Sequence, residues 1–194
     1  MPLGAFKAGL MGASGATTAA DVVLLSDQDA DSDTAIVITS GIDSTYTVYA
    51  FAFYNLNPET DNQHFTFNAS IDGGSNYNVA KTTLAQSNYN AEADAGGWSY
   101  EGGLDIHGTG YTTLFPSVGS GADECASVYM YLFNPASTTY AKHYIAEFSG
   151  YRAENAVYDF YSGGYFNTTD NIDALRFLFA SGDFEGTIKM WGMK

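Results

Sequence analysis

The sequence of 194 residues has little cysteine, few basic residues and no long apolar run, and each shortage excludes a class of protein. Its single cysteine, Cys125, excludes an internal disulfide and a zinc site built from cysteines. Only 7 Lys and Arg stand against 22 Asp and Glu, and the resulting net charge of −15 disfavours binding to nucleic acid. No stretch approaches about 20 consecutive apolar residues, so we expect no membrane span.

The sequence motifs of hydrolytic and metal-dependent enzymes are also missing. The three histidines, His64, His107 and His143, show neither H-E-x-x-H nor H-x-H spacing, and no G-x-S-x-G elbow or phosphate-binding glycine loop occurs. The paired carboxylates of a glycosidase meet only in space, so spacing along the chain does not identify them. We therefore expect no catalytic activity, no metal and no cofactor, with a small glycan hydrolase as the third alternative.

What the sequence does contain is aromatic residues and β patterning. Fifteen Tyr and 13 Phe occur, and short runs rich in Val, Thr, Tyr and Phe alternate with clusters of Gly, Asn, Asp and Ser. Apolar residues alternate with polar ones most cleanly from Phe65 to Ile71, which predicts a sheet covered on one side. The predicted strands are Thr34–Thr39, Thr45–Asn55, His64–Ser70, Tyr77–Leu84, Ser127–Phe133, Thr139–Phe148, Ala156–Phe166, Ala174–Phe179 and Thr187–Trp191.

These patterns predict an all-β protein without a persuasive helical period. Val128–Phe133 is apolar on both faces, which is typical of a central strand. We predict a single β-sandwich of two antiparallel sheets, jelly-roll-like, with an extended N-terminal arm. Asn88–Ser120 is rich in Gly, Ala and Asn, and we interpret it as a long surface loop that carries short strands.

The first 33 residues differ from the rest of the chain. Residues 1–15 are apolar but diluted by glycine, and their only base lies inside the apolar part, which argues against a secretory signal. The alternatives are a disordered leader and an extended arm whose Leu3, Phe6 and Leu10 dock on a partner, and we favour the arm. We therefore divide the chain into an N-terminal arm and acidic linker at 1–33 and a β-sandwich domain at 34–194.

Two short segments resemble known motifs. Asp27–Asp33 has the D-x-D-x-D spacing of a calcium loop, but Ser32 and Ile38 occupy the positions that need Gly and Glu. A solvated acidic linker is therefore favoured over a loose cation site. Ser70–Tyr77 resembles the Asp-box of sialidases, in which the Asp and Gly shape a hairpin turn, and we interpret it as a turn.

Trp98, Tyr100 and Tyr111 are the candidate ligand or interface aromatics. They lie in the Gly-rich segment, where a tyrosine or tryptophan offers a large contact area with a polar tip. The alternative for these side chains is packing in the core or on the sheet surface.

Four segments are informative when taken together: MPLGAFKAGL at the start, Tyr54–Gly74, Leu132–His143 and Phe177–Lys194. They resemble small structural proteins of tailed bacteriophages, particularly marine and cyanobacterial ones. The resemblance implies a non-enzymatic virion component with a β-sandwich body. It transfers no functional residue to this chain.

Under this resemblance we expect a capsid decoration or cement protein, located in the virion. It would hold the major capsid protein or another virion protein through its arm, and would form a homotrimer through its aromatic surface. The alternative is a tail-associated or host-surface module that binds glycan through Trp98, Tyr100 and their loop.

Overall fold

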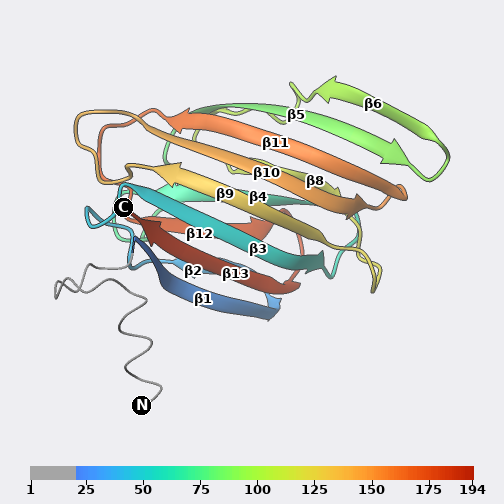
Figure 1. Ribbon diagram of the computed structural model, residues 1–194, viewed down its shortest axis with the longest axis horizontal. Helices are drawn as coiled ribbons and strands as arrows, with labels where there is room; N and C mark the ends of the chain where they lie inside the picture. Colours follow the sequence, from blue (N-terminus) through green and yellow to red (C-terminus); the bar gives the residue numbers. More distant parts are fainter. Residues whose placement is uncertain (1–20) are drawn as a thin grey trace, which may run out of the picture.

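The structure, a computed structural model, describes residues 21–194, which form only β-strands and their connections (Figure 1). The strands are β1 (Val22–Asp33), β2 (Ile36–Ile38), β3 (Val48–Pro58), β4 (Gln63–Ser70), β5 (Lys81–Ala91), β6 (Ala95–Tyr100), β7 (His107–Gly108), β8 (Thr112–Val118), β9 (Ala126–Phe133), β10 (Lys142–Arg152), β11 (Ala156–Phe166), β12 (Ala174–Phe179) and β13 (Phe184–Met193). The all-β prediction is confirmed. Within these residues we find no helix with the length and apolar character to cross a membrane.

The strands belong to one antiparallel sheet that is nearly closed as a barrel. Hydrogen-bonded neighbours follow the order β1-β13-β3-β9-β10-β8-β4-β12-β2. The two ends of this path are in contact, since Nε2 of Gln28 in β1 donates a hydrogen bond of 3.4 Å to the carbonyl oxygen of Val37 in β2. The link between β10 and β8 is narrow and consists of the single pair Arg152–Val118.

A second set of strands extends the sheet from β10. Strand β11 pairs with β10 along its whole length, β5 pairs with β11, and both β6 and β7 pair with β5. In Figure 1 a front layer contains, from bottom to top, β1, β13, β3, β9, β10, β11, β5 and β6. Strands β2, β12, β4 and β8 lie behind it. Hydrogen bonding therefore joins the two layers into one sheet, where the sequence led us to expect two.

Phenylalanine rings from both layers fill the core. The ring of Phe53 in β3 lies 5.1 Å from that of Phe177 in β12 and 5.7 Å from that of Phe65 in β4, measured between centroids. Phe148 of β10 completes the cluster, 6.3 Å from Phe65. These side chains are almost completely buried, and burial of each contributes about 1.5–3 kcal/mol. The period of two in the sequence thus places Phe65 of β4 and Phe177 of β12 on the inward side, as the structure does.

The acidic stretch expected to be a linker is part of the sheet. Residues 22–33 form β1, which pairs with β13. Lys189 of β13 donates a hydrogen bond of 2.8 Å to Asp27, and Thr187 donates one of 2.7 Å to Asp29. Acidic side chains suit a strand at the end of a sheet, because charge there discourages pairing with other chains.

The segment Asn88–Ser120, expected to be a long surface loop that carries short strands, contains the end of β5 and strands β6, β7 and β8. Strand β8 is buried along its whole length, so its sequence TTLFPSV shows no alternation. Pro116 also weakens the strand pattern. It lies where β8 pairs with β4 in an irregular register, which accommodates a residue without an N–H donor.

The polar side of β4 is buried, although its alternation predicted a sheet with one side in solvent. Thr66, Asn68 and Ser70 are all buried. Thr66 donates a hydrogen bond of 3.0 Å to the carbonyl oxygen of Leu178, and Asn68 donates one of 2.9 Å to that of Thr109. Because these polar groups are hydrogen-bonded, their burial is tolerated.

The Asp-box-like segment forms a tight turn, as predicted. The side-chain amide of Asn76 donates a hydrogen bond of 2.7 Å to Asp72, and the hydroxyl of Ser70 donates another of 2.7 Å. These hydrogen bonds favour the ionised carboxylate and lower the pKa of Asp72 to about 2. Gly73 and Gly74 have φ of 71° and 85°, which glycine adopts most readily.

The two ends of the described chain are neighbours. The backbone N–H of Lys194 donates a hydrogen bond of 3.0 Å to the carbonyl oxygen of Asp21. This follows from the antiparallel pairing of β1 with β13, which places Val22 opposite Met193.

Candidate functional site

In the front layer, side chains that point outward from neighbouring strands lie opposite one another. They form rows that run across the strands from β1 to β5. In the central row, Trp191 of β13 lies beside Ala50 of β3, and Tyr131 of β9 lies beside Ile145 of β10. The complete row is Leu24, Trp191, Ala50, Tyr131, Ile145, Gly163 and Leu84. This row is apolar or aromatic across seven strands.

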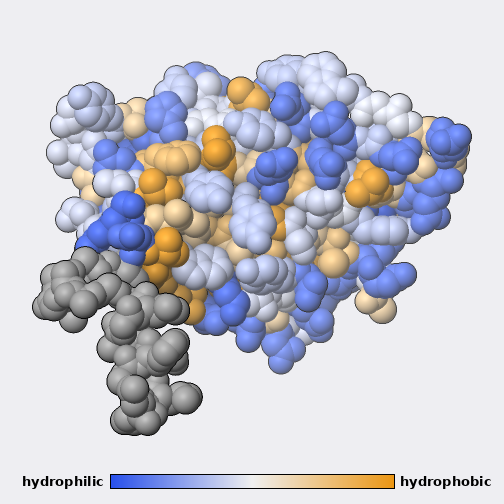
Figure 2. Space-filling model, viewed as in Figure 1, coloured by the Kyte–Doolittle hydropathy of each residue, from blue (hydrophilic) through white to orange (hydrophobic). Residues whose placement is uncertain are grey.

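Six aromatic side chains on three strands dominate this side of the molecule. They are Tyr129, Tyr131, Phe133, Tyr161, Tyr165 and Trp191, and we call them the outer aromatic face. Tyr129 is 60% exposed and Tyr165 is 41% exposed, while the other four are half-buried. The rings of Tyr131 and Phe133 stack with centroids 6.4 Å apart. In Figure 2 this side of the molecule mixes pale and orange side chains with blue ones, and blue gathers along the lower and right-hand margins.

Few charges interrupt the outer aromatic face. In its central row and the two rows beside it, from β13 to β5, only Glu147 and Lys189 carry a full charge at neutral pH. The chain as a whole contains 22 acidic residues, so charge is depleted here relative to the rest of the surface. Depletion of charge together with enrichment of Tyr and Trp is the composition of a protein interface core.

A groove of about 430 Å³ lies on this face between β10 and β5. Its floor is Gly163 and Gly164 of β11, and its apolar sides are Leu84 and Ile145. Gly163 lies between those two side chains in the central row. The side chain of Tyr161 leans over it, because a Cβ at Gly163 would lie 2.9 Å from the Tyr161 hydroxyl. Tyr161 lines both this groove and a smaller hollow of about 70 Å³.

Polar groups also lie along this groove. His143 and Thr82 line it, and the ring of Tyr165 lies 6.0 Å from that of His143. The hydroxyl of Thr82 is within 3.1 Å of Nδ1 of His107 and accepts a hydrogen bond of 3.3 Å from Asn167. No acidic side chain lines the groove. It therefore suits a neutral ligand with both apolar and hydroxyl surfaces.

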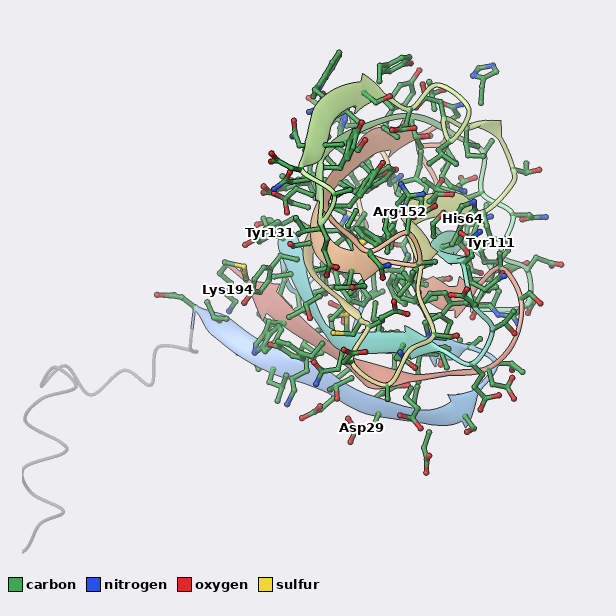
Figure 3. The ribbon with its side chains drawn as sticks, turned by 90° about the vertical axis from the view of Figure 1, so that its right-hand side faces the viewer. Asp29, His64, Tyr111, Tyr131, Arg152 and Lys194 are labelled. Carbon is green, nitrogen blue, oxygen red and sulfur yellow. The ribbon has the colours of Figure 1, made fainter. Side chains whose placement is uncertain are left out.

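The three aromatic residues singled out in the sequence do not form one site. Trp98 and Tyr100 are 64% and 58% exposed on β6, beside Asn88 and Gln86 of β5. Tyr111 is half-buried just before β8, and Figure 3 shows it on the opposite side of the molecule from Tyr131. The structure thus separates Tyr111 from the outer aromatic face.

The hydroxyl of Tyr100 donates a hydrogen bond to Asp105. This hydrogen bond and the negative charge of Asp105 raise the pKa of Tyr100. The contact connects the end of β6 to the segment before β7, which holds the exposed ring in place.

The remaining candidate residues lie outside the face or outside the described chain. Leu3, Phe6 and Leu10, predicted to dock on a partner, precede the described residues. Within residues 21–194, no group of three or more His, Cys, Asp or Glu is placed to hold a metal ion. This includes the acidic side chains of Asp27–Asp33.

The three histidines are also apart from one another. Nδ1 of His64 accepts a hydrogen bond of 3.0 Å from the backbone N–H of Ser117. Burial, and then the positive charge of Arg152, lower the pKa of His64 (Figure 3). His143 of β10 and His107 of β7 share a row but have β11 and β5 between them.

An acidic cleft of about 530 Å³ lies elsewhere on the surface. Four carboxylates line it, together with asparagines and Cys125. The acidic residues are Glu59, Asp123, Glu124 and Glu185. One of them already has a structural role, because Glu124 accepts a hydrogen bond of 2.7 Å from the backbone N–H of Gly121. The negative charge of these four side chains attracts cations in general.

Neither a family model, nor a curated protein sequence, nor a solved structure matches this chain. A function must therefore be argued from its own residues, and the outer aromatic face is the feature that carries most of that argument.

Proposed function

We propose that this chain is a non-enzymatic structural protein of a tailed-phage virion, a capsid decoration protein that binds neighbouring protein through the outer aromatic face. The observation that carries the proposal is that face, where six aromatic rings and few charges lie on the exposed side of the front layer. The resemblance of four segments of the sequence to phage structural proteins supports the same class. The same proposal includes a jelly-roll connectivity of the strands and the assembly of the chain into a homotrimer.

The physical argument is one of buried area. Tyrosine and tryptophan lose little conformational entropy on binding and bury a large apolar surface with a polar tip. Tyr129 alone is 60% exposed, so a partner that covers it removes much apolar surface from water. A partner that binds only in the assembled particle would stabilise that particle by mass action.

The direct test is a map of intact particles that locates this chain. The proposal expects hundreds of copies on the shell, with the outer aromatic face against the major capsid protein or a neighbouring copy. A low copy number with Tyr129 and Tyr131 in solvent would contradict it.

A matched pair of variants tests the contact itself. Tyr129→Ser should weaken binding to undecorated shells by about tenfold or more, because it removes a ring from the centre of the contact. The control is Tyr140→Ser, since Tyr140 is 71% exposed but lies in the connection between β9 and β10. Equal loss of binding in both variants would contradict the proposed face.

A second candidate function is that of a tail-associated module that binds host-surface glycan. Two observations favour it: Trp98 and Tyr100 are exposed on β6, and the groove above Gly163 has a lining without acidic side chains. Aromatic rings beside hydroxyl and imidazole groups suit a sugar platform. Retention of wild type on a panel of glycans, lost in Trp98→Ala but kept in Tyr140→Ala, would favour this candidate.

The third candidate, a small glycan hydrolase, would use the acidic cleft. Its test is turnover of a polysaccharide that Glu185→Gln abolishes, because Glu185 lines the cleft. The proposed decoration protein requires no turnover by either form.

A further inference from the structure

Strand β6 has one edge without a strand partner in residues 21–194. It pairs with β5 on one side only, and Figure 1 shows it as the outermost strand of the front layer. The backbone N–H of Glu101 donates a hydrogen bond of 2.9 Å to the carbonyl oxygen of Ala85, which lies opposite it in the β5–β6 register. Because hydrogen-bonded pairs alternate in an antiparallel ladder, the N–H and C=O groups of Gly96, Trp98 and Tyr100 point away from β5.

This edge lacks the usual protections against pairing. Proteins blunt exposed edges with lysine, proline, a β-bulge or a covering loop. The sequence of β6, AGGWSY, contains no charged residue and no proline, and its register with β5 has no shift. Its two large side chains, Trp98 and Tyr100, are both more than half exposed. Such an edge is ready to accept another strand.

We propose that this edge pairs with β6 of a second copy, antiparallel, about a two-fold axis at Trp98. In that register Trp98 lies opposite its counterpart in the second copy, and the three outward-pointing backbone positions meet one another. Tyr100 lies opposite Gly96, and Ser99 lies opposite Gly97. The large tyrosine ring then covers a glycine, which is how aromatic residues compensate for glycines in sheet edges.

The charges near β6 fit the same register. Glu101 would lie opposite Ala95, and Asp94 would lie opposite Gly102, so no acidic side chain faces another directly. This self-complementarity is the reason for assigning the edge to a second copy of the chain. Each copy still carries a net charge of −15, so long-range repulsion opposes association. The pairing should therefore strengthen as salt screens that repulsion.

The pairing is independent of the proposed function, because it uses the backbone edge of β6 and not the centre of the outer aromatic face. A two-fold contact of this kind is isologous and closes with two copies. It joins the two front layers into one continuous sheet.

The test is a charge swap at the two-fold axis, measured by sedimentation velocity on the full chain over a range of concentrations. In the absence of shells, wild type should reach twice the mass of one chain. Three times that mass would support the trimer of the proposed function and would overturn the pairing. Trp98→Lys and Trp98→Glu should each weaken self-association by about tenfold or more, because like charges then lie directly opposite each other. An equimolar mixture of the two variants should associate again, since a lysine then faces a glutamate. A mixture that stays monomeric while wild type is dimeric would overturn the pairing.

The matched control is the same pair of changes at Tyr140, which is 71% exposed and lies in the connection between β9 and β10. Tyr140→Lys and Tyr140→Glu should leave the wild-type association of the β6 edge unchanged. The same changes at Tyr129 test the outer aromatic face instead. If the Tyr129 variants lose self-association and the Trp98 variants keep it, the β6 inference fails while the outer aromatic face gains support. The pairing would also be overturned if wild type is a monomer that binds glycan and Trp98→Ala loses that binding.

Hydrogen exchange provides a second readout that needs no variant. At concentrations that favour the dimer, the amides of Gly96, Trp98 and Tyr100 should become protected, and dilution should remove that protection. Gly97 and Ser99 serve as internal controls, because their amides face β5 and are protected at every concentration. Unprotected amides at Gly96 and Trp98 in a dimeric sample would overturn the inference.

Discussion

Nζ of Lys81 donates a hydrogen bond of 2.7 Å to Oδ1 of Asn68, and neither side chain is exposed to solvent. The same ammonium group donates a hydrogen bond of 2.7 Å to the carbonyl oxygen of Gly110 and a longer one to that of Val79. All three acceptors are uncharged oxygens. Burial without a carboxylate partner lowers the pKa of Lys81 to about 7. One buried lysine thus links the start of β5 to β4 and to the connection before β8.

This lysine should make stability depend on pH between 7 and 10.5. In that range the unfolded chain binds a proton at Lys81 that the folded chain has released, because the unfolded pKa is near 10.5 and the folded pKa is about 7. The contribution of Lys81 to the free energy of unfolding should therefore rise with pH, by up to about 1.4 kcal/mol per pH unit. Urea unfolding measured at pH 6, 8 and 10 checks this.

The control for that prediction is Lys81→Met, which keeps much of the volume and removes the titrating group. The difference in free energy of unfolding between wild type and this variant should move in favour of wild type as pH rises from 7 to 10. Below pH 7 the difference should be constant, since both states of wild type are then protonated at Lys81. Parallel curves from pH 6 to 10 would contradict the lowered pKa.

Asp72 should act at the acidic end of the pH range. Its pKa is lowered from 3.8 to about 2, first by the side-chain amide of Asn76 and then by Ser70. A carboxylate with a lowered folded pKa stabilises the protein above its unfolded pKa, and that contribution is lost as pH falls through the folded pKa. The denaturation midpoints of wild type and Asp72→Ala should therefore converge between pH 4 and 2. An NMR titration of the Asp72 carboxyl with a midpoint near 4 would contradict this.

Phe177 should be among the most costly residues to truncate. Its ring lies 5.1 Å from that of Phe53 and 6.3 Å from that of Phe65, and it is completely buried. Phe177→Ala should lower the free energy of unfolding by about 3–5 kcal/mol, because it leaves a cavity in the core. Tyr129→Ala, on the outer aromatic face, should change it by less than about 1 kcal/mol, because that ring is mostly in solvent. Similar losses in both variants would mean that Tyr129 is covered in the isolated chain.

Gly150 should tolerate no side chain. A Cβ at this position would lie 2.8 Å from Cζ of Phe115 and 2.9 Å from Cβ of Ala126. Gly150→Ala should therefore destabilise the protein by about 1–3 kcal/mol, as overpacking of a core does. The matched control is Gly103→Ala, where a Cβ meets no atom within 4 Å. Thermal unfolding of the two variants compares them, and equal melting temperatures would contradict the prediction.

The strands with a clear period of two could be predicted from the sequence. The predicted bounds of β11, 156–166, and of β12, 174–179, are those of the structure. Phe65 and Phe67 point into the core as their alternation indicates. These predictions succeed because burial on one face of a strand is a local property that the order of residues records directly.

Strands that depart from this pattern were not placed from the sequence: β1 was expected to be a linker, and β6 and β8 were expected only as short strands without bounds in a long loop. Strand β1 is acidic, β6 contains Gly96 and Gly97, and β8 is buried on both sides and includes Pro116. In each case contacts with a neighbouring strand outweigh a local sequence that favours a linker or a loop.

The outer aromatic face lay beyond prediction for a different reason. The alternation of β9 shows that Tyr129 and Tyr131 share one side of a strand. It does not show that Trp191 and Ile145 are their neighbours. That neighbourhood depends on the order and register of strands far apart in the chain. The burial of Lys81 likewise depends on Asn68 and Gly110 coming from other elements.

The hydrogen bond between Lys194 and Asp21 makes the described chain almost a closed ring. In a variant that lacks residues 1–20, a short glycine linker from residue 194 to residue 21 would join the two without disturbing a strand. The chain can then be opened between Gly102 and Gly103, which are exposed and lie between β6 and β7. Such a circular permutant should fold to the same sheet, because exposed connections tolerate new termini. It would also show that the order in which the strands are synthesised is not what determines their arrangement.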